Sequence, residues 1–374
     1  MSVRVGVAGV AGMGLAHIIG FPQIDDVELT AICDPWPKAL ANAAGLAPDA
    51  TQFEAFEEMC GSGLVDAVAI ATPNALHIDN VRTALEARLH VYCEKPLANT
   101  VADCRTLADL ASSTGRSVQI GFQHRFQHGY ATAKRLVASG ELGALQRADL
   151  RASDWFRPNA YFAKRKWRAT WEQAGGGVLI MQAIHQLDAY LWITGTPARV
   201  TARAWSGRPG VQVEDDVYAV LEFTGGARGM ISATTLDPAG ENRLDFTCDG
   251  GALRAWGDRL RRARWEDPTT QMLAERTNLF ESPPVSWEDV EGSGDAMTYD
   301  ECVAACERDF IDAIRSGRTP SIDPDEATRS VEVANAVYLS ALTGESVDLP
   351  LDPSVYDEAF ARMCAGDLAL PRLV

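Results

Sequence analysis

Hydrophobic and polar positions along the first 121 residues alternate between short apolar runs and segments with helical spacing. Apolar runs over residues 3–10, 27–33, 67–71, 91–93 and 118–121 predict buried strands. The segments through Ile19 and over residues 37–44, 76–88 and 101–113 predict helices between them. Strands separated by helices pair in parallel through crossovers, so this region predicts an α/β, doubly wound parallel sheet of the Rossmann type.

The pattern changes after about residue 124. A helix is predicted over residues 131–139, and a partly alternating strand follows over residues 146–156. Further strands are predicted over residues 198–205, 216–223, 229–234 and 243–248, and helices after the glycine run 175–177 and over residues 301–316 and 327–342. This order predicts a C-terminal α+β domain with a large, predominantly antiparallel open sheet. We therefore divide the chain into domains at residues 1–123 and 124–351, with a tail at 352–374 that is either a helix docking on a neighbouring subunit or a frayed end.

Composition narrows the classes of function. The 374 residues suit two domains, and the formal net charge of −17 disfavours nucleic acid and anionic membrane surfaces as partners. The eight cysteines form no C-x-x-C pair and several lie in apolar runs, which predicts buried free thiols in a reducing compartment. No run of 18 apolar residues occurs, so we expect a cytoplasmic protein without a membrane span.

A glycine-rich turn, Gly9-Val10-Ala11-Gly12-Met13-Gly14, lies directly between the first predicted strand and the first predicted helix. In a dinucleotide-binding turn the first glycine permits the tight bend, the second lets the pyrophosphate approach, and the third allows close helix packing. Here Ala11 holds the second position, where its Cβ should crowd that approach slightly. We predict that Gly9, Ala11, Gly12, Met13 and Gly14 contact a dinucleotide.

Asp34 strengthens this prediction because it ends the second strand, 20 residues beyond Gly14. A carboxylate at that place accepts hydrogen bonds from the adenosine ribose and repels a 2′-phosphate, which favours NAD over NADP. The structural alternative is that Asp34 only caps the next helix.

Polar side chains follow three neighbouring strands of the predicted sheet. They are Thr72, Asn74 and His77 after one strand, Glu94 and Lys95 after the next, and Gln123 after the last. Carboxyl ends of parallel strands meet at one edge, where open sheets bind ligands. Lys95 is the most informative, because the chain has only five lysines and this one ends a buried strand. Its ammonium would stabilise the oxyanion that develops as hydride leaves an alcohol; the alternative is an ion pair with Glu94.

Several motifs together make the chain similar to a known family. They are Asp66–Asn74 with His77, Val91-Tyr92-Cys93-Glu94-Lys95-Pro96-Leu97, Gly121–Phe126, Trp167-Arg168, the run from Gly175 to His185-Gln186-Leu187-Asp188, and Gly317–Pro320. The chain resembles the Gfo/Idh/MocA oxidoreductases, the family of glucose–fructose oxidoreductase and inositol dehydrogenase. The resemblance covers nearly the whole chain. It implies an NAD(P)-binding Rossmann domain and a second domain for substrate binding and oligomerisation. It also implies hydride transfer with a secondary alcohol of a sugar or cyclitol, in a homodimer or homotetramer.

The resemblance also implies roles for single residues. Lys95 matches the family's active-site lysine, and His185 matches the histidine that takes the hydroxyl proton. Residues near the cofactor are Thr72, Asn74, His77, Glu94, Lys95, Gln123, Trp167 and Arg168, and residues near the substrate are Lys95, Gln123, Gln182 and His185. No metal is expected, because His124 and His128 lack a third ligand at metal spacing, and a solvated or loop role suits them better.

Met181 departs from the family pattern, because many relatives carry Asp or Asn at this position, one turn before the histidine. A carboxylate there would orient His185, and methionine cannot. Three explanations stay open: Asp188 or Asp154 orients the ring, Lys95 carries more of the proton transfer, or the protein does not oxidise alcohols in the ordinary way. The alternative functions are therefore a non-catalytic NAD-binding sensor and an NAD-dependent, redox-neutral glycoside-cleaving enzyme.

Overall fold

The computed structural model describes residues 2–280, 282–290 and 297–372. It divides into two compact units, and neither is continuous in sequence. The first unit comprises Met1–Gln123, Glu172–Gly175 and Thr298–Val331, and the second comprises His124–Trp171, Gly176–Met297 and Glu332–Val374. Residues 172–175 and 298–331 thus cluster with the N-terminal unit, whereas the sequence-based division places them in the second domain. This difference arises from tertiary contacts, which local sequence patterns do not reveal.

The first unit contains a six-stranded sheet in the order β3-β2-β1-β4-β5-β6. Every neighbouring pair is parallel, as the alternation of strands and helices predicts. The order reverses between β1 and β4, and ligands of such sheets bind at this reversal. The strands are β1 (Val3–Ala8), β2 (Val27–Cys33), β3 (Thr51–Phe53), β4 (Ala67–Ile70), β5 (His90–Cys93) and β6 (Val118–Ile120).

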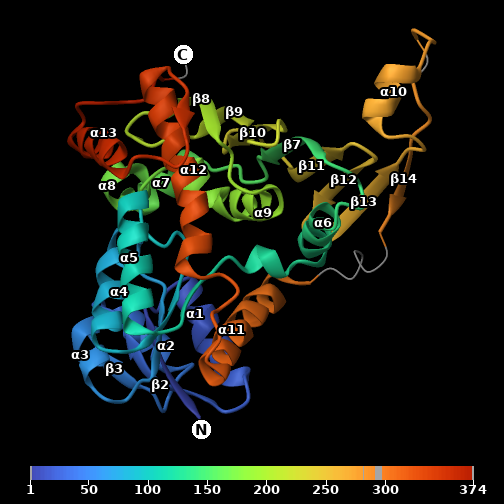
Figure 1. Ribbon diagram of the computed structural model, residues 1–374. Helices are drawn as coiled ribbons and strands as arrows, with labels where there is room; N and C mark the ends of the chain where they lie inside the picture. The colour runs from blue at the N-terminus through green and yellow to red at the C-terminus, as the bar shows by residue number, and fades with distance from the viewer. Residues whose placement is uncertain (1, 281, 291–296, 373–374) are drawn as a thin grey trace. The chain divides into compact units, whose positions relative to one another are not determined.

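Helices of the first unit follow the strands in turn, and Figure 1 shows α4 and α5 side by side in its blue-to-cyan part. They are α1 (Met13–Gly20), η1 (Phe21–Gln23), α2 (Pro37–Ala44), α3 (Phe56–Gly61), η2 (Asn74–Leu76), α4 (His77–Glu86), α5 (Val101–Thr114) and α11 (Tyr299–Ser316). The ends of α5 obey local rules: the Thr100 side chain accepts a hydrogen bond from the Asp103 amide, and Gly115 closes the helix with a φ of 65°. Thr298 and Glu301 form a capping box at the start of α11.

The second unit contains a nine-stranded sheet in the order β14-β13-β12-β11-β7-β10-β9-β8-β15. Most neighbours are antiparallel, as predicted, but β7 and β10 pair in parallel, so the sheet is mixed. The strands are β7 (Leu145–Ala152), β8 (Arg199–Trp205), β9 (Asp216–Glu222), β10 (Arg228–Thr234), β11 (Asn242–Cys248), β12 (Gly251–Trp256), β13 (Arg259–Arg264), β14 (Ser286–Asp289) and β15 (Val347–Asp348). The arginine-rich run 259–264 is a strand whose side chains pair with acidic residues, among them Glu288 and Asp289.

Helices of the second unit include α9, which is buried along nearly its whole length. The helices with residues in this unit are η3 (Gln123–Phe126), α6 (His128–Ala138), α7 (Asn159–Lys164), η4 (Lys166–Ala169), α8 (Trp171–Ala174), η5 (Val178–Gln182, a π-helix), α9 (Ile184–Thr194), α10 (Thr269–Glu275), α12 (Pro324–Thr343) and α13 (Pro353–Ala365); of these, η3, α8 and α12 also have residues in the first unit. Most of the predicted tail forms the helix α13, which buries Tyr356 and Met363. The last two residues of the tail, 373 and 374, lie outside the described range.

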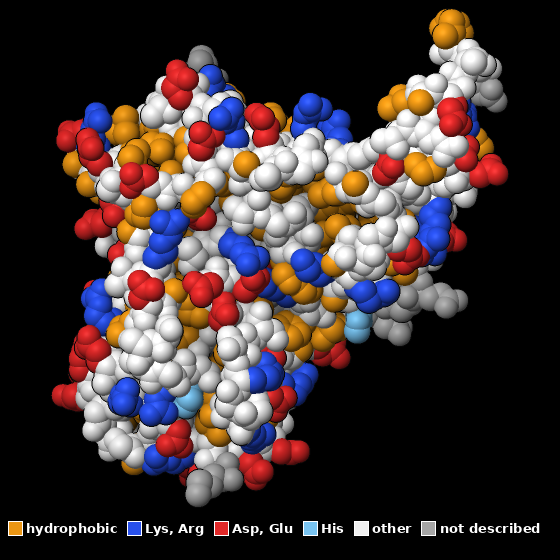
Figure 2. Space-filling view, viewed as in Figure 1, with side chains coloured by type: hydrophobic (Ala, Val, Ile, Leu, Met, Phe, Trp, Pro, Cys, Tyr) orange, Lys and Arg blue, Asp and Glu red, His pale blue; other side chains and the backbone are white. Residues whose placement is uncertain are grey.

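The segment that connects β13 to β14 contains α10 and extends beyond the sheet as an arm (Figure 1). Leu279 and Phe280 are 85% and 94% exposed there, and hydrophobic side chains mark the end of the arm in Figure 2. All eight cysteines are free, and seven of them are buried, as the sequence predicts. Among the described residues, no helix has the length and apolar character that crossing a membrane requires.

Candidate active site

The glycine turn links β1 to α1, and its glycines serve different purposes. Gly9 has a φ of 81°, and a Cβ on it would lie 2.6 Å from the carbonyl oxygen of Ala71. A Cβ on Gly14 would overlap the carbonyl of Gly9, so this residue permits the close packing of α1 on the turn. Gly12 has a φ of 59°, but a Cβ on it would meet no atom within 4 Å. The space above Gly12 is therefore open to a ligand.

The start of α1 and the side chain of Asp34 complete a cradle at this turn. Among the described residues no side chain caps the helix, and the amides of Gly14 and Leu15 donate to the carbonyls of Ala11 and Gly12 at 3.3 Å and 3.2 Å. The positive end of the helix dipole still favours an anion at this turn. Asp34 is 9% exposed; its carboxylate accepts hydrogen bonds from the Val10 amide at 3.1 Å and the Trp36 amide at 3.0 Å. The contact with Trp36 lies just before α2 (Pro37–Ala44), to which no side chain gives a cap among the described residues, so Asp34 does not cap this helix. The contact with Val10 ties the carboxylate to the glycine turn. These features fit the pyrophosphate and ribose of a dinucleotide.

The loop after β4 is braced by a buried histidine. His77 is 1% exposed; its Nδ1 lies 2.6 Å from the Pro96 carbonyl oxygen and its Nε2 lies 2.9 Å from the Thr72 carbonyl oxygen. Burial lowers the pKa of His77 by more than these carbonyl groups raise it. The ring thus joins the loop after β4 to the loop after β5. Asn74, in the same loop, donates from Nδ2 to the Ala174 carbonyl at 2.9 Å.

Glu94 and Lys95 follow β5, and Gln123 lies just beyond β6. Glu94 is buried and Lys95 is half-buried; burial lowers the pKa of Lys95, and the neighbouring Glu94 carboxylate raises it by less. Gln123 donates from Nε2 to the hydroxyl of Tyr299 at 2.7 Å, and that hydroxyl lies 3.3 Å from the sulfur of Met13. Among the described residues the buried Oε1 of Gln123 has no hydrogen-bond partner, which suits a ligand at this edge.

The structure therefore gathers one group of predicted residues at the C-terminal edge of the first unit's sheet. This group consists of Gly9, Ala11, Gly12, Met13, Gly14, Asp34, Thr72, Asn74, His77, Glu94, Lys95 and Gln123. Tyr299 belongs to the same unit and contacts two members of the group, although no motif in the sequence points to it. The remaining predicted residues, Trp167, Arg168, Gln182 and His185, belong to the second unit.

His185 lies at the start of α9 and is 7% exposed. Its ring stacks on that of His124, with ring centres 4.6 Å apart and planes 26° from parallel. The expectation of a solvated or loop role for His124 is therefore wrong in part, because this residue on η3 is half-buried against His185. Both oxygens of Asp188, one candidate for orienting His185, accept hydrogen bonds at 2.7 Å from Arg125. Asp154, the other candidate, is exposed.

Gln182, Arg168 and Trp167 gather around Tyr161 in the second unit. Gln182 donates from Nε2 to the Tyr161 hydroxyl at 3.0 Å. The Arg168 guanidinium lies 4.1 Å from the centre of the Tyr161 ring and 5.6 Å from that of Trp167. Burial lowers the pKa of Arg168, although the guanidinium stays charged in the ordinary pH range. Sequence reasoning proposed three of these residues separately and missed the tyrosine that joins them.

A buried carboxyl group supports the segment that leads to His185. Glu214, 1% exposed, accepts hydrogen bonds from the amides of Gly177 at 2.6 Å and Leu179 at 2.9 Å, and from the Tyr338 hydroxyl at 2.9 Å. Burial raises the pKa of Glu214 to about 7, against the effect of these donors. The hydrogen bonds fix the start of η5, the π-helix that directly precedes α9. This support was missed because Glu214 is remote in sequence from the residues it holds.

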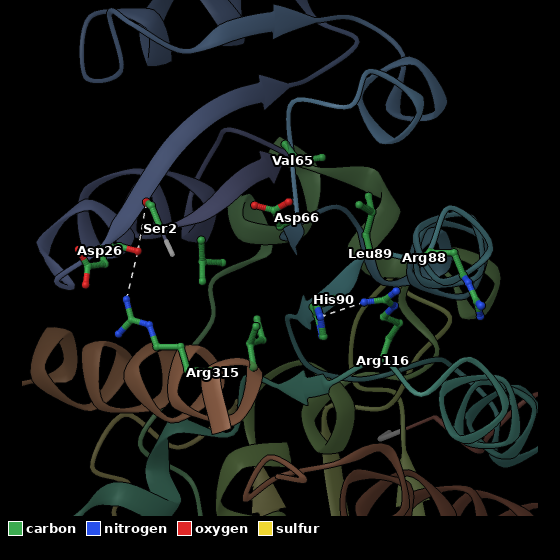
Figure 3. A pocket seen from close by; sticks show the side chains of 11 residues that line it. Ser2, Asp26, Val65, Asp66, Arg88, Leu89, His90, Arg116 and Arg315 are labelled. Carbon is green, nitrogen blue, oxygen red and sulfur yellow. Dashed lines mark hydrogen bonds between the residues drawn. The ribbon is translucent and has the colours of Figure 1, made fainter. Parts of the chain in front are cut away.

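A hollow at the opposite edge of the first unit's sheet holds none of the predicted residues. Figure 3 shows it beside the N-terminal ends of the strands, lined by Asp66, His90, Arg116 and Arg315 among others. His90 accepts a hydrogen bond from the Ser117 amide, and burial lowers its pKa. Parallel sheets present their ligand sites at the other edge, where the glycine turn and Lys95 lie.

The sheet, the glycine turn and the Asp34 carboxylate together are typical of a dinucleotide-binding protein, and the comparison with known families agrees. Residues 3–122 match the family described as "Oxidoreductase family, NAD-binding Rossmann fold", and residues 130–254 match "GFO/IDH/MocA C-terminal domain". The chain belongs to the Gfo/Idh/MocA family, and it is an NAD(P)-dependent oxidoreductase.

Relatives span almost the full length of the chain. It is 30% identical over 347 residues to D-xylose 1-dehydrogenase (NADP(+)) 2 of Haloferax volcanii, which covers 92% of this chain and 99% of the relative. It is 26% identical over 358 residues to scyllo-inositol 2-dehydrogenase (NAD(+)) of Bacillus subtilis, covering 93% and 96%. The WlbA dehydrogenase of Bordetella pertussis, solved with NADH and UDP-GlcNAcA, superposes with a TM-score of 0.79 at 26% identity, covering 94% of this chain and 100% of that one.

Proposed function

We propose that this protein is an NAD-dependent dehydrogenase that transfers hydride between the nicotinamide and a secondary alcohol or ketone of a sugar or cyclitol. The observation that carries the proposal is the position of Lys95. This half-buried lysine lies at the same edge of the sheet as the open glycine turn. The relatives named above, a xylose dehydrogenase and an inositol dehydrogenase, supply the class of substrate.

The cofactor assignment rests on the cradle of the first unit. Gly12 leaves room for the pyrophosphate, the start of α1 offers it the positive end of a helix dipole, and Asp34 accepts from the adenosine ribose. Asp34 favours NAD because a carboxylate repels the 2′-phosphate of NADP. When bound, NAD supplies the hydride acceptor for the reaction.

The protein's own groups handle the proton and the charge. We assign to a ring nitrogen of His185 the removal of the substrate's hydroxyl proton as the carbon loses its hydride and becomes a carbonyl carbon. The Lys95 ammonium donates a hydrogen bond to the same oxygen and stabilises its negative charge. The reverse reaction returns the proton from His185 to the oxygen. Gln123 and Gln182 supply amide groups for the other hydroxyls of the substrate.

The test is the absorbance of reduced nicotinamide when the purified protein is mixed with NAD or NADP and a panel of aldoses, deoxysugars and inositols. We expect a signal with NAD that falls at least about 100-fold in Lys95→Ala. Lys164→Ala, which removes an exposed lysine, is the matched control and should keep the signal. Normal turnover by Lys95→Ala would refute the assignment.

A second candidate function is an NAD-binding sensor without turnover, and Met181 is the observation that favours it. This residue is half-buried in η5, one turn before His185, where it offers the imidazole no charged partner. The same assay separates the two candidates. A sensor would bind NAD and give no reduced nicotinamide with any member of the panel. With a chromogenic glycoside added to the panel, a redox-neutral glycosidase would release the aglycone without net reduction.

We also propose that the protein forms a homodimer or homotetramer through the second unit's sheet. Val220 on β9 and Met230 on β10 are cross-strand neighbours that are 53% and 40% exposed, and Tyr218 beside them is 50% exposed. An apolar group of this kind on a sheet face suits contact with another subunit. Light scattering after size exclusion should give a multiple of the chain mass, and Val220→Asp should lower it. A monomeric mass for the unmodified protein would contradict this.

A further inference from the structure

A cluster of three buried ionisable side chains includes Glu94, the residue that precedes Lys95. His17 on α1 is fully buried; its Nε2 lies 3.2 Å from Oε1 of Glu94, and its Nδ1 lies 2.7 Å from Oε1 of Glu307 on α11. Glu94 is 5% exposed and Glu307 is fully buried. All three residues belong to the first unit, so the cluster is a feature of the Rossmann fold with its added helix α11.

The surrounding packing is fitted to this cluster. A Cβ on Gly20 would overlap the Glu307 carboxylate, and a Cβ on Gly121 would lie 2.9 Å from Oε1 of Glu94. The Tyr92 and Phe21 rings lie 5.0 Å and 5.9 Å from the His17 ring, centre to centre. Two glycines thus make room for the carboxylates, and aromatic rings enclose the imidazole.

The geometry determines the charge of His17. Each ring nitrogen faces a carboxyl oxygen. With both carboxyl groups ionised, both contacts are hydrogen bonds only if both nitrogens carry a proton. Burial lowers the pKa of His17, but the hydrogen bonds and charges of Glu307 and Glu94 outweigh it and raise the value to about 9. Burial raises the pKa of Glu307 in turn. An imidazolium between two carboxylates leaves the cluster with one net negative charge.

Lys95 is the next residue after Glu94, and Glu94 is the charge that raises its pKa against the effect of burial. The net negative charge of the cluster therefore compensates the Lys95 ammonium. Among the described residues, the other titratable groups that interact with the cluster include His77, Tyr92, Tyr299, Cys306 and Arg308. Burial raises the pKa of the two tyrosines and of the thiol, to about 12 for Cys306, so these three stay neutral near physiological pH.

We propose that His17, held as an imidazolium by Glu307, is a positioning residue of the active site that fixes the Glu94 carboxylate beside Lys95. This inference rests on the proposed role of Lys95. When His17 loses a proton, its neutral ring keeps one N–H for two carboxylates. One carboxylate then loses its donor in a site closed to water, and Glu94 no longer has a fixed place. Turnover should therefore fall on the alkaline side as His17 titrates.

The test compares the intact protein with Glu307→Gln, and with Asp312→Asn as the control. Asp312 is an exposed carboxylate on the same helix, so both variants remove one negative charge. Nitrogen NMR of the ring follows the titration of His17, whose signal is identified among six histidines by its loss in His17→Gln. The pH dependence of acylation, read by peptide mass spectrometry, gives the titration of Lys95 among five lysines. The profile of kcat against pH is measured in parallel.

We expect doubly protonated His17 at neutral pH in the intact protein and in Asp312→Asn. In Glu307→Gln its titration should move down by about one to three pH units, because one carboxylate partner is gone. The alkaline limb of the kcat profile should move with it. Retention of the intact protein's titration in Glu307→Asp would show that charge at this place, and not bulk, is required.

Two results would overturn the inference. One is a neutral His17 in the intact protein at neutral pH. The other is an alkaline limb of the kcat profile whose midpoint matches the titration of Lys95 and does not move when the pKa of His17 changes. If Glu307→Gln does not fold, the intact protein still decides, because the limb and the His17 titration must share a midpoint. Failure of the proposed function looks different: the intact protein then reduces no NAD, or Lys95→Ala keeps its turnover, while the His17 titration stays readable.

Discussion

Replacing Gly12 by alanine separates the binding role of the glycine turn from its role in folding. Gly12 has a φ of 59°, and a Cβ there would meet no atom within 4 Å. With its ψ of −116° the residue has a backbone conformation that strongly favours glycine, so we expect the substitution to cost the fold about 1–3 kcal/mol of unfolding free energy. The same Cβ would occupy the space left for the pyrophosphate. Loss of even one hydrogen bond to a charged group costs about 1.5–3 kcal/mol, so we expect NAD affinity to fall by about 10- to 100-fold.

Gly63 provides a matched control for this substitution. Its φ is 71°, a Cβ there would also meet no atom within 4 Å, and it lies between α3 and β4, away from the turn. Gly63→Ala should therefore also lower the unfolding free energy and leave NAD affinity unchanged. Denaturant titration measures the first quantity and calorimetric titration with NAD the second. Equal affinities for NAD in the two variants would refute the assignment of Gly12 to the cofactor.

Three further predictions concern other parts of the two units. Trp36 is 73% exposed beside Asp34, and we expect Trp36→Ala to weaken NAD binding by about tenfold through loss of stacking on the adenine; unchanged affinity in a calorimetric titration would contradict this. The pKa of Glu214 rises from 4.5 to about 7 on folding, so the folded state binds more protons between these values and stability falls as pH rises through this window, by about 3 kcal/mol. In Glu214→Gln this slope should be absent from denaturant titrations run across the window, and an unchanged slope would assign it to other groups. Asp188→Asn should cost about 3–5 kcal/mol of unfolding free energy because it leaves the buried Arg125 without its carboxylate, and a loss below about 1 kcal/mol would show that the pair is not needed for stability.

Local patterns were enough to predict which polar residues lie together at one edge of the first unit's sheet. Asp34, Lys95 and Gln123 each come directly after an apolar run, and the parallel pairing of those runs brings their ends to one edge. The fold class followed from the same pattern, because a βαβ alternation has few other solutions. The parallel pairing of β7 and β10 could not be predicted, because the strand pattern does not encode which partner each strand takes.

Contacts between residues that are remote in sequence could not be predicted. Glu307 contacts His17 across most of the chain, and Glu214 holds the amides of Gly177 and Leu179. In the sequence, nothing distinguishes Glu307 from the other acidic residues on an amphipathic helix. Its burial depends on α11 clustering with the first unit, from which it is far apart in sequence. The stacking of His124 on His185 was also missed, because these two residues are far apart in sequence.

The central claim is that hydride passes between a sugar carbon and the nicotinamide in this protein. The most direct measurement uses a substrate from the panel that carries deuterium on the carbon bearing the reacting hydroxyl, with mass spectrometry of the recovered cofactor. We predict reduced nicotinamide that is heavier by one deuterium and is formed by the intact protein but not by Lys95→Ala. Cofactor that is bound yet recovered oxidised and unlabelled, with the substrate unchanged, would contradict the claim.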